Sequence, residues 1–146
     1  MKKTLYIGLI ATFFILTGCA SNGPIILGNE PLSHEEAFKE GKVRLECTWG
    51  CGYKLGLNLK EIDALIYSHS WNELATKVMD IGFGGDLTYY YLGRAAEGLG
   101  YFPAAKAYYV LSLSASEKCD KVTKATCQGH NFPDDINKHL ENIKGK

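Results

Sequence analysis

Cysteine is the residue type whose number and spacing in this sequence most clearly offer chemistry. The chain has 146 residues and five Cys, four of which form two close pairs, Cys47-x3-Cys51 and Cys119-x7-Cys127. Thiols at such spacing can form disulfides or supply the ligands of a zinc ion. Neither pair has the C-x2-C spacing of a zinc knuckle, which favours disulfides. The fifth, Cys19, stands apart and needs a separate explanation.

The residues before Cys19 have the pattern of an export signal. Lys2 and Lys3 form a basic start, and an almost unbroken apolar run follows over residues 5–16. That run is shorter than the roughly 20 residues needed to cross a bilayer. A basic start and a short apolar stretch are typical of a signal peptide, which we place at residues 1–18.

The end of this segment, Leu16-Thr17-Gly18-Cys19, resembles the lipobox of bacterial lipoproteins at all four positions. The resemblance implies cleavage after Gly18 and a covalent lipid on Cys19, which would hold the chain to a membrane. Ala20 is not acidic, and in similar lipoproteins this implies the periplasmic face of the outer membrane. Residues 19–32 are then a lipidated N-terminus and tether, with a reach of at most roughly 35 Å for about ten residues.

Export to an oxidising compartment makes two disulfides the expected state of the other four Cys. Proximity favours the pairs Cys47–Cys51 and Cys119–Cys127, and a bridge across the domain such as Cys47–Cys127 is the alternative. A zinc site built from all four thiols is the other interpretation, and we expect no metal. The lipid on Cys19 is the only non-protein group that we expect.

Composition sets broad limits on what the rest of the chain does. Apolar residues make up 46% and charged residues 22%, as in an ordinary folded domain, and the formal net charge is zero. Zero net charge gives no electrostatic reason to expect nucleic acid as a partner.

Catalytic patterns are missing from the sequence. Residues 82–86 (Gly-Phe-Gly-Gly-Asp) resemble a phosphate loop only superficially, because no Lys-Ser/Thr follows them. The four His residues lack metal-ligand spacing, and we expect them at the surface. We therefore predict a protein that is not an enzyme.

The hydrophobic pattern predicts an all-α domain over residues 33–146. Ser33 and Glu36 form a capping box that opens a short helix, and residues 48–56, with three Gly, read as a disulfide-tied loop. Apolar residues then recur at helical spacing in four stretches, which begin near Asn58, Ser70, Asp86 and Phe102. Pro133 opens a final helix that we expect to cap the stack.

The third and fourth stretches together resemble a tetratricopeptide repeat. The motif positions are occupied by Leu92-Gly93, Ala96, Gly100, Phe102, Ala105, Tyr109 and Ser112, with Tyr89 in place of the usual Trp. The first two stretches are a weaker copy, so the repeats cover about 58–82 and 86–115. The resemblance implies a short stack of helix pairs with a concave groove that binds a protein or peptide.

The groove positions implied by the resemblance are Leu59, Asp63, Ile66 and Tyr67 in the first repeat, and Tyr90, Arg94 and Glu97 in the second. We expect Tyr90 and Arg94 to face the same side, since they are one helical turn apart. The guanidinium of Arg94 suits a carboxylate or peptide carbonyl. The alternative is that Arg94 pairs with Glu97 or Asp63 on a solvated face.

These features together predict a lipid-anchored adaptor that recruits a protein partner in the cell envelope, in a secretion, pilus or wall-remodelling assembly. The alternative is a small periplasmic inhibitor or ligand-binding lipoprotein that acts through its two disulfide loops.

Overall fold

The computed structural model describes residues 25–27, 32–47, 49–119 and 127–146. The predicted signal peptide, the lipobox with Cys19, and Ala20 lie outside these residues. Within them the fold is all-α, as predicted, apart from one pair of two-residue strands. No helix in the described part is both long and apolar enough to cross a membrane.

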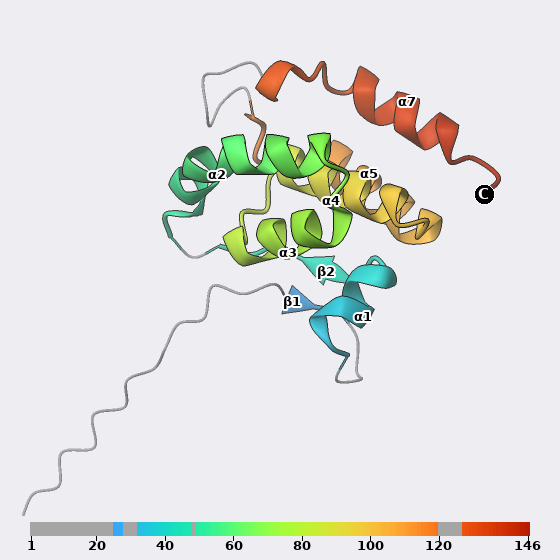
Figure 1. Cartoon of the computed structure of the whole chain (residues 1–146), viewed down its shortest axis with the longest axis horizontal. Coiled ribbons are helices and arrows are strands. Elements are labelled where there is room, and N and C mark those ends of the chain that lie inside the picture. Colours follow the sequence, from blue (N-terminus) through green and yellow to red (C-terminus); the bar gives the residue numbers. More distant parts are fainter. Residues whose placement is uncertain (1–24, 28–31, 48, 120–126) are drawn as a thin grey trace, which may run out of the picture.

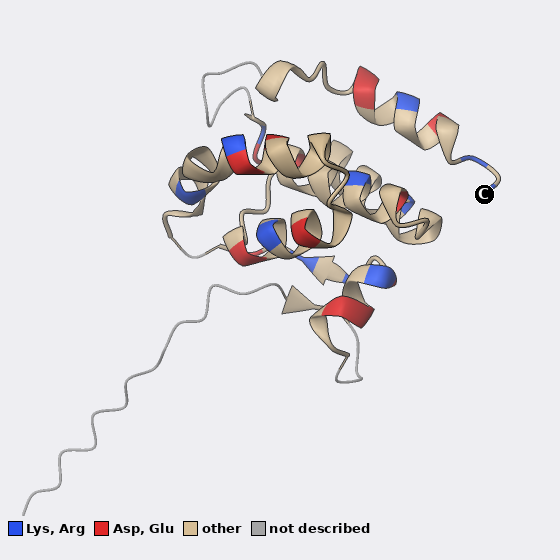
Figure 2. Ribbon diagram, in the orientation of Figure 1, with Lys and Arg blue, Asp and Glu red and all other residues tan. Residues whose placement is uncertain are grey.

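The helices and strands follow one another as short elements (Figure 1). They are β1 (Ile25–Ile26), α1 (His34–Lys39), β2 (Val43–Arg44), α2 (Cys51–Tyr67), α3 (Trp71–Ile81), α4 (Asp86–Gly98), α5 (Phe102–Ser114), the 3-10 turn η1 (Cys127–Gly129) and α7 (Asp134–Asn142). Helix α4 has α3 and α5 as its most extensive neighbours, and α2 packs against α3. Lys, Arg, Asp and Glu are interspersed along the chain rather than gathered on one side (Figure 2).

The N-terminal part of the domain is pinned to the core through α1 and β2. The Ser33 hydroxyl and the Glu36 carboxylate cap the start of α1 reciprocally, which confirms the predicted capping box. Tyr108 on α5 donates a hydrogen bond to the Phe38 carbonyl at 3.0 Å, and the backbone N–H of Leu45 donates to the Tyr89 hydroxyl at 3.0 Å. Two tyrosine hydroxyls therefore join this part to α4 and α5.

The predicted tether is partly structured. Ile25 pairs with Arg44 and Ile26 with Val43 in an antiparallel arrangement, so this part of the predicted tether is a short strand. β-branched side chains favour extended backbone, and Ile26 packs against the core.

The predicted loop over residues 48–56 was wrong from Cys51 onward, because α2 already begins there. Glycine lowers helix propensity by about 1 kcal/mol per residue. Here the burial of Cys51 and Leu55 in the core offsets that cost. The disulfide between Cys47 and Cys51 ties the preceding residues to the first turn of the helix.

Helices α4 and α5 pack closely because a glycine lies at their contact. A Cβ atom on Gly93 would clash with the Tyr109 ring, which lies directly over it. Ala96 and Ala105 are fully buried, as expected for small residues between two close helices. The four helices α2 to α5 follow one another in the predicted order, although α2 begins before the predicted first repeat. The tetratricopeptide-like stacking of the pairs stays a prediction.

After the second disulfide, the chain continues into α7, which contacts α5. Cys119 and Cys127 are bonded to each other, so both disulfides have the predicted local pairing. Helix α7 packs against α5 with Ile136 buried, where a capping helix was expected.

We expect Gly93→Ala to lower the free energy of unfolding by about 1 kcal/mol or more. Overpacking against Tyr109 costs about 1–3 kcal/mol and exceeds the gain in helix propensity. Gly56, inside α2 with nothing near its Cβ position, is the matched control, and Gly56→Ala should raise stability by about 0.5–1 kcal/mol. Urea denaturation measures both, and a stabilised Gly93→Ala variant would show that this contact is not tight.

Candidate functional site

The predicted groove residues divide into two groups in the structure. On α2, Asp63 and Tyr67 are exposed, whereas Leu59 and Ile66 are half-buried against the core. On α4, Arg94 and Glu97 are half-buried, and Tyr90 is only 2% exposed.

The expectation that Tyr90 faces an open groove was therefore wrong. Residues that follow the second disulfide cover its ring. The ring centroids of His130, Phe132 and His139 lie 4.6, 5.0 and 5.7 Å from that of Tyr90. The side of α4 where the groove was predicted is occupied by residues of the chain's own C-terminal segment.

A chain of hydrogen bonds joins this segment to α4 and α5. Arg94 Nη1 donates to the Tyr90 hydroxyl at 3.2 Å, and that hydroxyl lies 3.4 Å from His139 Nε2. His139 Nδ1 is 2.8 Å from Glu97 Oε2, and the Tyr109 hydroxyl donates to the same oxygen at 2.6 Å. These contacts are all satisfied when His139 is neutral with its proton on Nδ1.

Burial favours the neutral forms of the His and Tyr side chains in and around this network. It lowers the pKa of His139, and the Arg94 charge beside the ring lowers it further. Burial also lowers the pKa of His130 and raises the pKa of Tyr90 and Tyr109. The two His rings are therefore uncharged and the two hydroxyls protonated near neutral pH.

The order Tyr90, His139, Glu97 is that of a nucleophile, a base and an orienting carboxylate. A nucleophile must reach its substrate, and the Tyr90 side chain is buried. In this arrangement the network holds α7 in place. The expectation of surface His residues was wrong for His130 and His139, which are half-buried. Helical spacing could have indicated this for His139, because it lies three positions after the buried Ile136 and so on the same side of α7.

Arg94 also lines a hollow of about 310 Å³. The remaining lining residues are Trp71, Glu97, Gly98, Phe102 and Lys146. We call this hollow the Arg94 pocket. It lies where the start of α3, the end of α4 and the start of α5 meet the C-terminal residue.

Aromatic rings hold the two cations of the Arg94 pocket. The Arg94 guanidinium lies 5.8 Å from the centre of the Trp71 ring, and Lys146 Nζ lies 5.1 Å from that of Phe102. The His69 ring stacks on Trp71 at 5.3 Å. A Cβ on Gly98 would clash with the Trp71 ring, so a glycine is needed for this placement.

Neither cation has an acidic partner among the residues that the structure describes. The alternative that Arg94 pairs with Glu97 or Asp63 is not seen, because Glu97 is bound by His139 and Tyr109 and no ion pair joins Arg94 to Asp63. A half-buried guanidinium keeps most of its five donors for an outside acceptor. In the described part of the chain, the one hydrogen bond of Arg94 goes to Tyr90, and the Glu97 carboxylate also lines the Arg94 pocket.

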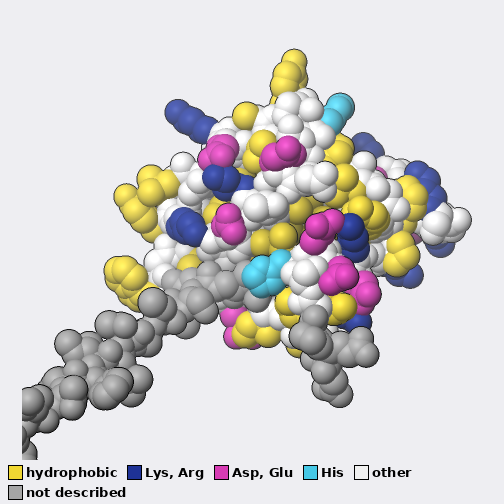
Figure 3. All heavy atoms as spheres, turned by 60° about the horizontal axis from the view of Figure 1, so that its bottom comes forward, with side chains coloured by type: hydrophobic (Ala, Val, Ile, Leu, Met, Phe, Trp, Pro, Cys, Tyr) yellow, Lys and Arg dark blue, Asp and Glu magenta, His cyan; other side chains and the backbone are white. Residues whose placement is uncertain are grey.

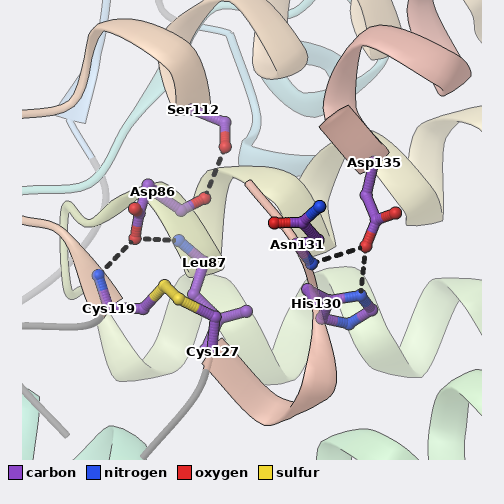
Figure 4. The surroundings of a disulfide bond; sticks show 8 residues. All are labelled: Asp86, Leu87, Ser112, Cys119, Cys127, His130, Asn131 and Asp135. Carbon is purple, nitrogen blue, oxygen red and sulfur yellow. Dashed lines mark hydrogen bonds and ion pairs between the residues drawn. A yellow bond between two sulfur atoms is a disulfide. The ribbon is translucent and has the colours of Figure 1, made fainter. Parts of the chain in front are cut away.

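A second hollow, of about 410 Å³, is lined by Cys119 and Cys127. Figure 4 shows the surroundings of the disulfide that joins these two residues. Asp86, which is 4% exposed, accepts hydrogen bonds from the backbone of Leu87 at 2.7 Å and of Cys119 at 2.9 Å. The Ser112 hydroxyl donates to the Asp86 carbonyl at 2.6 Å. These bonds fix the segment after α5 against the start of α4, which is a structural role.

The described residues contain no group of three or more His, Cys, Asp or Glu side chains placed to hold a metal ion. No known protein family, curated protein or solved structure matches the chain.

Substitution of two fully buried tyrosines tests how much the hydrogen-bond network contributes to the free energy of unfolding. The Tyr91 hydroxyl has no hydrogen-bond partner among the described residues, whereas the Tyr109 hydroxyl donates to Glu97. We expect Tyr91→Phe to raise the free energy of unfolding by about 1 kcal/mol and Tyr109→Phe to lower it by about 1–3 kcal/mol. Chemical denaturation of the two variants measures this, and equal effects would contradict the assignment.

Proposed function

We propose that the protein is a lipid-anchored, non-enzymatic adaptor that holds a protein partner at the inner face of the outer membrane. The observation that carries the proposal is the Arg94 pocket, where two cations without acidic partners in the described part of the chain lie between aromatic rings.

The anchor is supported by the lipobox at Leu16–Cys19 and by the apolar run before it. The two disulfides fit the same location, because disulfides persist in oxidising compartments such as the periplasm. A lipid on Cys19 would keep the domain at the membrane without a spanning helix.

The partner's chemistry follows from the pocket. Trp71 and Phe102 offer flat apolar surface, and Arg94 and Lys146 offer charge-assisted hydrogen bonds. Binding energy at protein interfaces concentrates in Trp, Tyr and Arg residues of this kind. The best fit is an acidic side chain, or a terminal carboxylate, next to an apolar residue of the partner. The exposed Asp63 and Tyr67 of α2 are further contacts implied by the predicted groove.

The competing function is that of a ligand-binding or inhibitory lipoprotein acting through its disulfide loops. The hollow beside Cys119 and Cys127 favours this alternative. Substitutions at the Arg94 pocket and at Lys118, which lines the other hollow, distinguish the two functions when tested against the same partner.

Cys19→Ser tests the anchor. We expect the variant to fold normally and to move from the membrane fraction to the soluble fraction, because the acylated residue is lost. Cell fractionation in high salt, with thermal denaturation of both forms, measures this. A variant that still sediments with membranes would show that lipid on Cys19 is not the anchor.

Arg94→Gln tests the pocket. We expect the affinity for a partner captured from the envelope to fall by on the order of 1–3 kcal/mol, because a charge-assisted contact is lost. The variant should stay folded, since it loses one hydrogen bond to Tyr90, worth about 1 kcal/mol.

Lys144→Gln is the matched control, because Lys144 is an exposed lysine near the same end of the chain with a partner of its own, Glu141. Its affinity should equal that of the wild type. If Arg94→Gln binds as tightly as Lys144→Gln, the pocket is not the binding site.

A further inference from the structure

Three large apolar side chains stand exposed at the start of α2. Trp49 is 88% exposed, Tyr53 75% and Leu57 67%. Tyr53 and Leu57 are one helical turn apart, so they share a face. Trp49 and Tyr53 line the same open hollow of about 400 Å³. We call these three residues the Trp49 edge.

Packing into the core does not explain why the three residues of the Trp49 edge are apolar. Helix α2 packs inward through Leu55 and Ile62, which are fully buried. The edge lies on the opposite side of the helix, where solubility favours polar residues. Hydrophobic side chains project from the rim of the domain in the space-filling view (Figure 3). An exposed cluster of large apolar residues marks a surface that is covered in use.

The residue types favour a membrane surface as the cover. Trp and Tyr gather where a bilayer meets water, because each has an apolar ring and a polar tip. Lys60 lies exposed on the same helix, whereas Lys54 donates a hydrogen bond to the Asp80 carbonyl. A lysine at the interface between a bilayer and water keeps its charge among the lipid headgroups, while its apolar stem covers apolar surface.

The length of chain up to Cys19 places a membrane within reach. Ile25 is paired with Arg44, and six residue steps separate Ile25 from Cys19, at most roughly 21 Å of extended chain. Five steps lead from Arg44 to Trp49, at most roughly 18 Å. Chain length therefore limits both Cys19 and Trp49 to at most roughly 21 Å from the same strand pair.

We propose that the Trp49 edge inserts into the headgroup region of the phospholipid bilayer that carries the acyl chains of Cys19. The inference rests on the proposed lipid anchor. It gives the domain an orientation, because the C-terminus and the start of α5 lie on the opposite side from the start of α2 (Figure 1). The Arg94 pocket, lined by Phe102 and Lys146, then faces away from the membrane.

Fluorescence quenching tests this contact on the full acylated protein. The protein is reconstituted in vesicles of phosphatidylethanolamine and phosphatidylglycerol, with and without brominated phosphatidylcholine. The chain has two Trp, so Trp49→Phe leaves only Trp71. We expect brominated lipid to remove about half or more of the Trp49 emission, as for an interfacial Trp, and to leave the Trp49→Phe variant unquenched.

Two further variants probe the neighbouring residues. Tyr53→Ser combined with Leu57→Ser should reduce the quenching of Trp49, because the edge then binds lipid less well. Tyr67 has the same side chain as Tyr53 and is 90% exposed. It lies 14 residues after Tyr53 along α2, about 21 Å away. Tyr67→Ser should leave the quenching unchanged.

The outcomes separate the anchor from the edge. Protein that does not float with the vesicles overturns the anchor, and the inference with it. Protein that floats and shows no quenching leaves the anchor standing and overturns the inference. Floating protein whose Trp49 is unquenched and whose association depends on its concentration identifies the edge as a protein interface, which also overturns the inference.

Discussion

Burial of α4 is the constraint on which the rest of the structure depends. Every residue from Asp86 to Gly93 is buried, and so are Ala95 and Ala96. A helix that is buried on all sides must be surrounded by other elements, because no single neighbour covers more than one face. Helices α3 and α5 cover two faces, the residues around β2 reach a third through Tyr89, and the segment around α7 covers the Tyr90 side.

Buried polar atoms on α4 then determine how its neighbours are attached. A buried hydroxyl or carboxylate costs stability unless it is hydrogen-bonded. Asp86 accepts a hydrogen bond from Cys119, and Tyr89 accepts one from Leu45, the residue after β2. Tyr90 and Glu97 contact α7 through His139. The use of Glu97 in this last contact leaves Arg94 without a carboxylate in the described part of the chain. The same network that closes the C-terminal side thus creates the cationic pocket.

Sequence patterns predicted the helices well and the site less well, for a physical reason. Helical spacing and capping residues are local, so the helix order, the capping box at Ser33 and the local disulfides could be predicted. The start of α2 could not, because long-range burial of Leu55 outweighs the low helix propensity of nearby glycines. The cover over Tyr90 depends on residues about 40 to 50 positions away, and no local pattern encodes it.

The predicted open groove and the Arg94 pocket differ in what covers them. A groove lined by the first helix of each helix pair is open only if the segment that follows the last pair does not pack into it. Here α7 and the residues before it close over α4, and His139 bonds to Glu97. What remains open is the end of the helix pair, where Gly98 lets Trp71 lie flat beside Arg94. A partner that binds there needs no displacement of α7, so the closed network and the pocket can serve the same bound state.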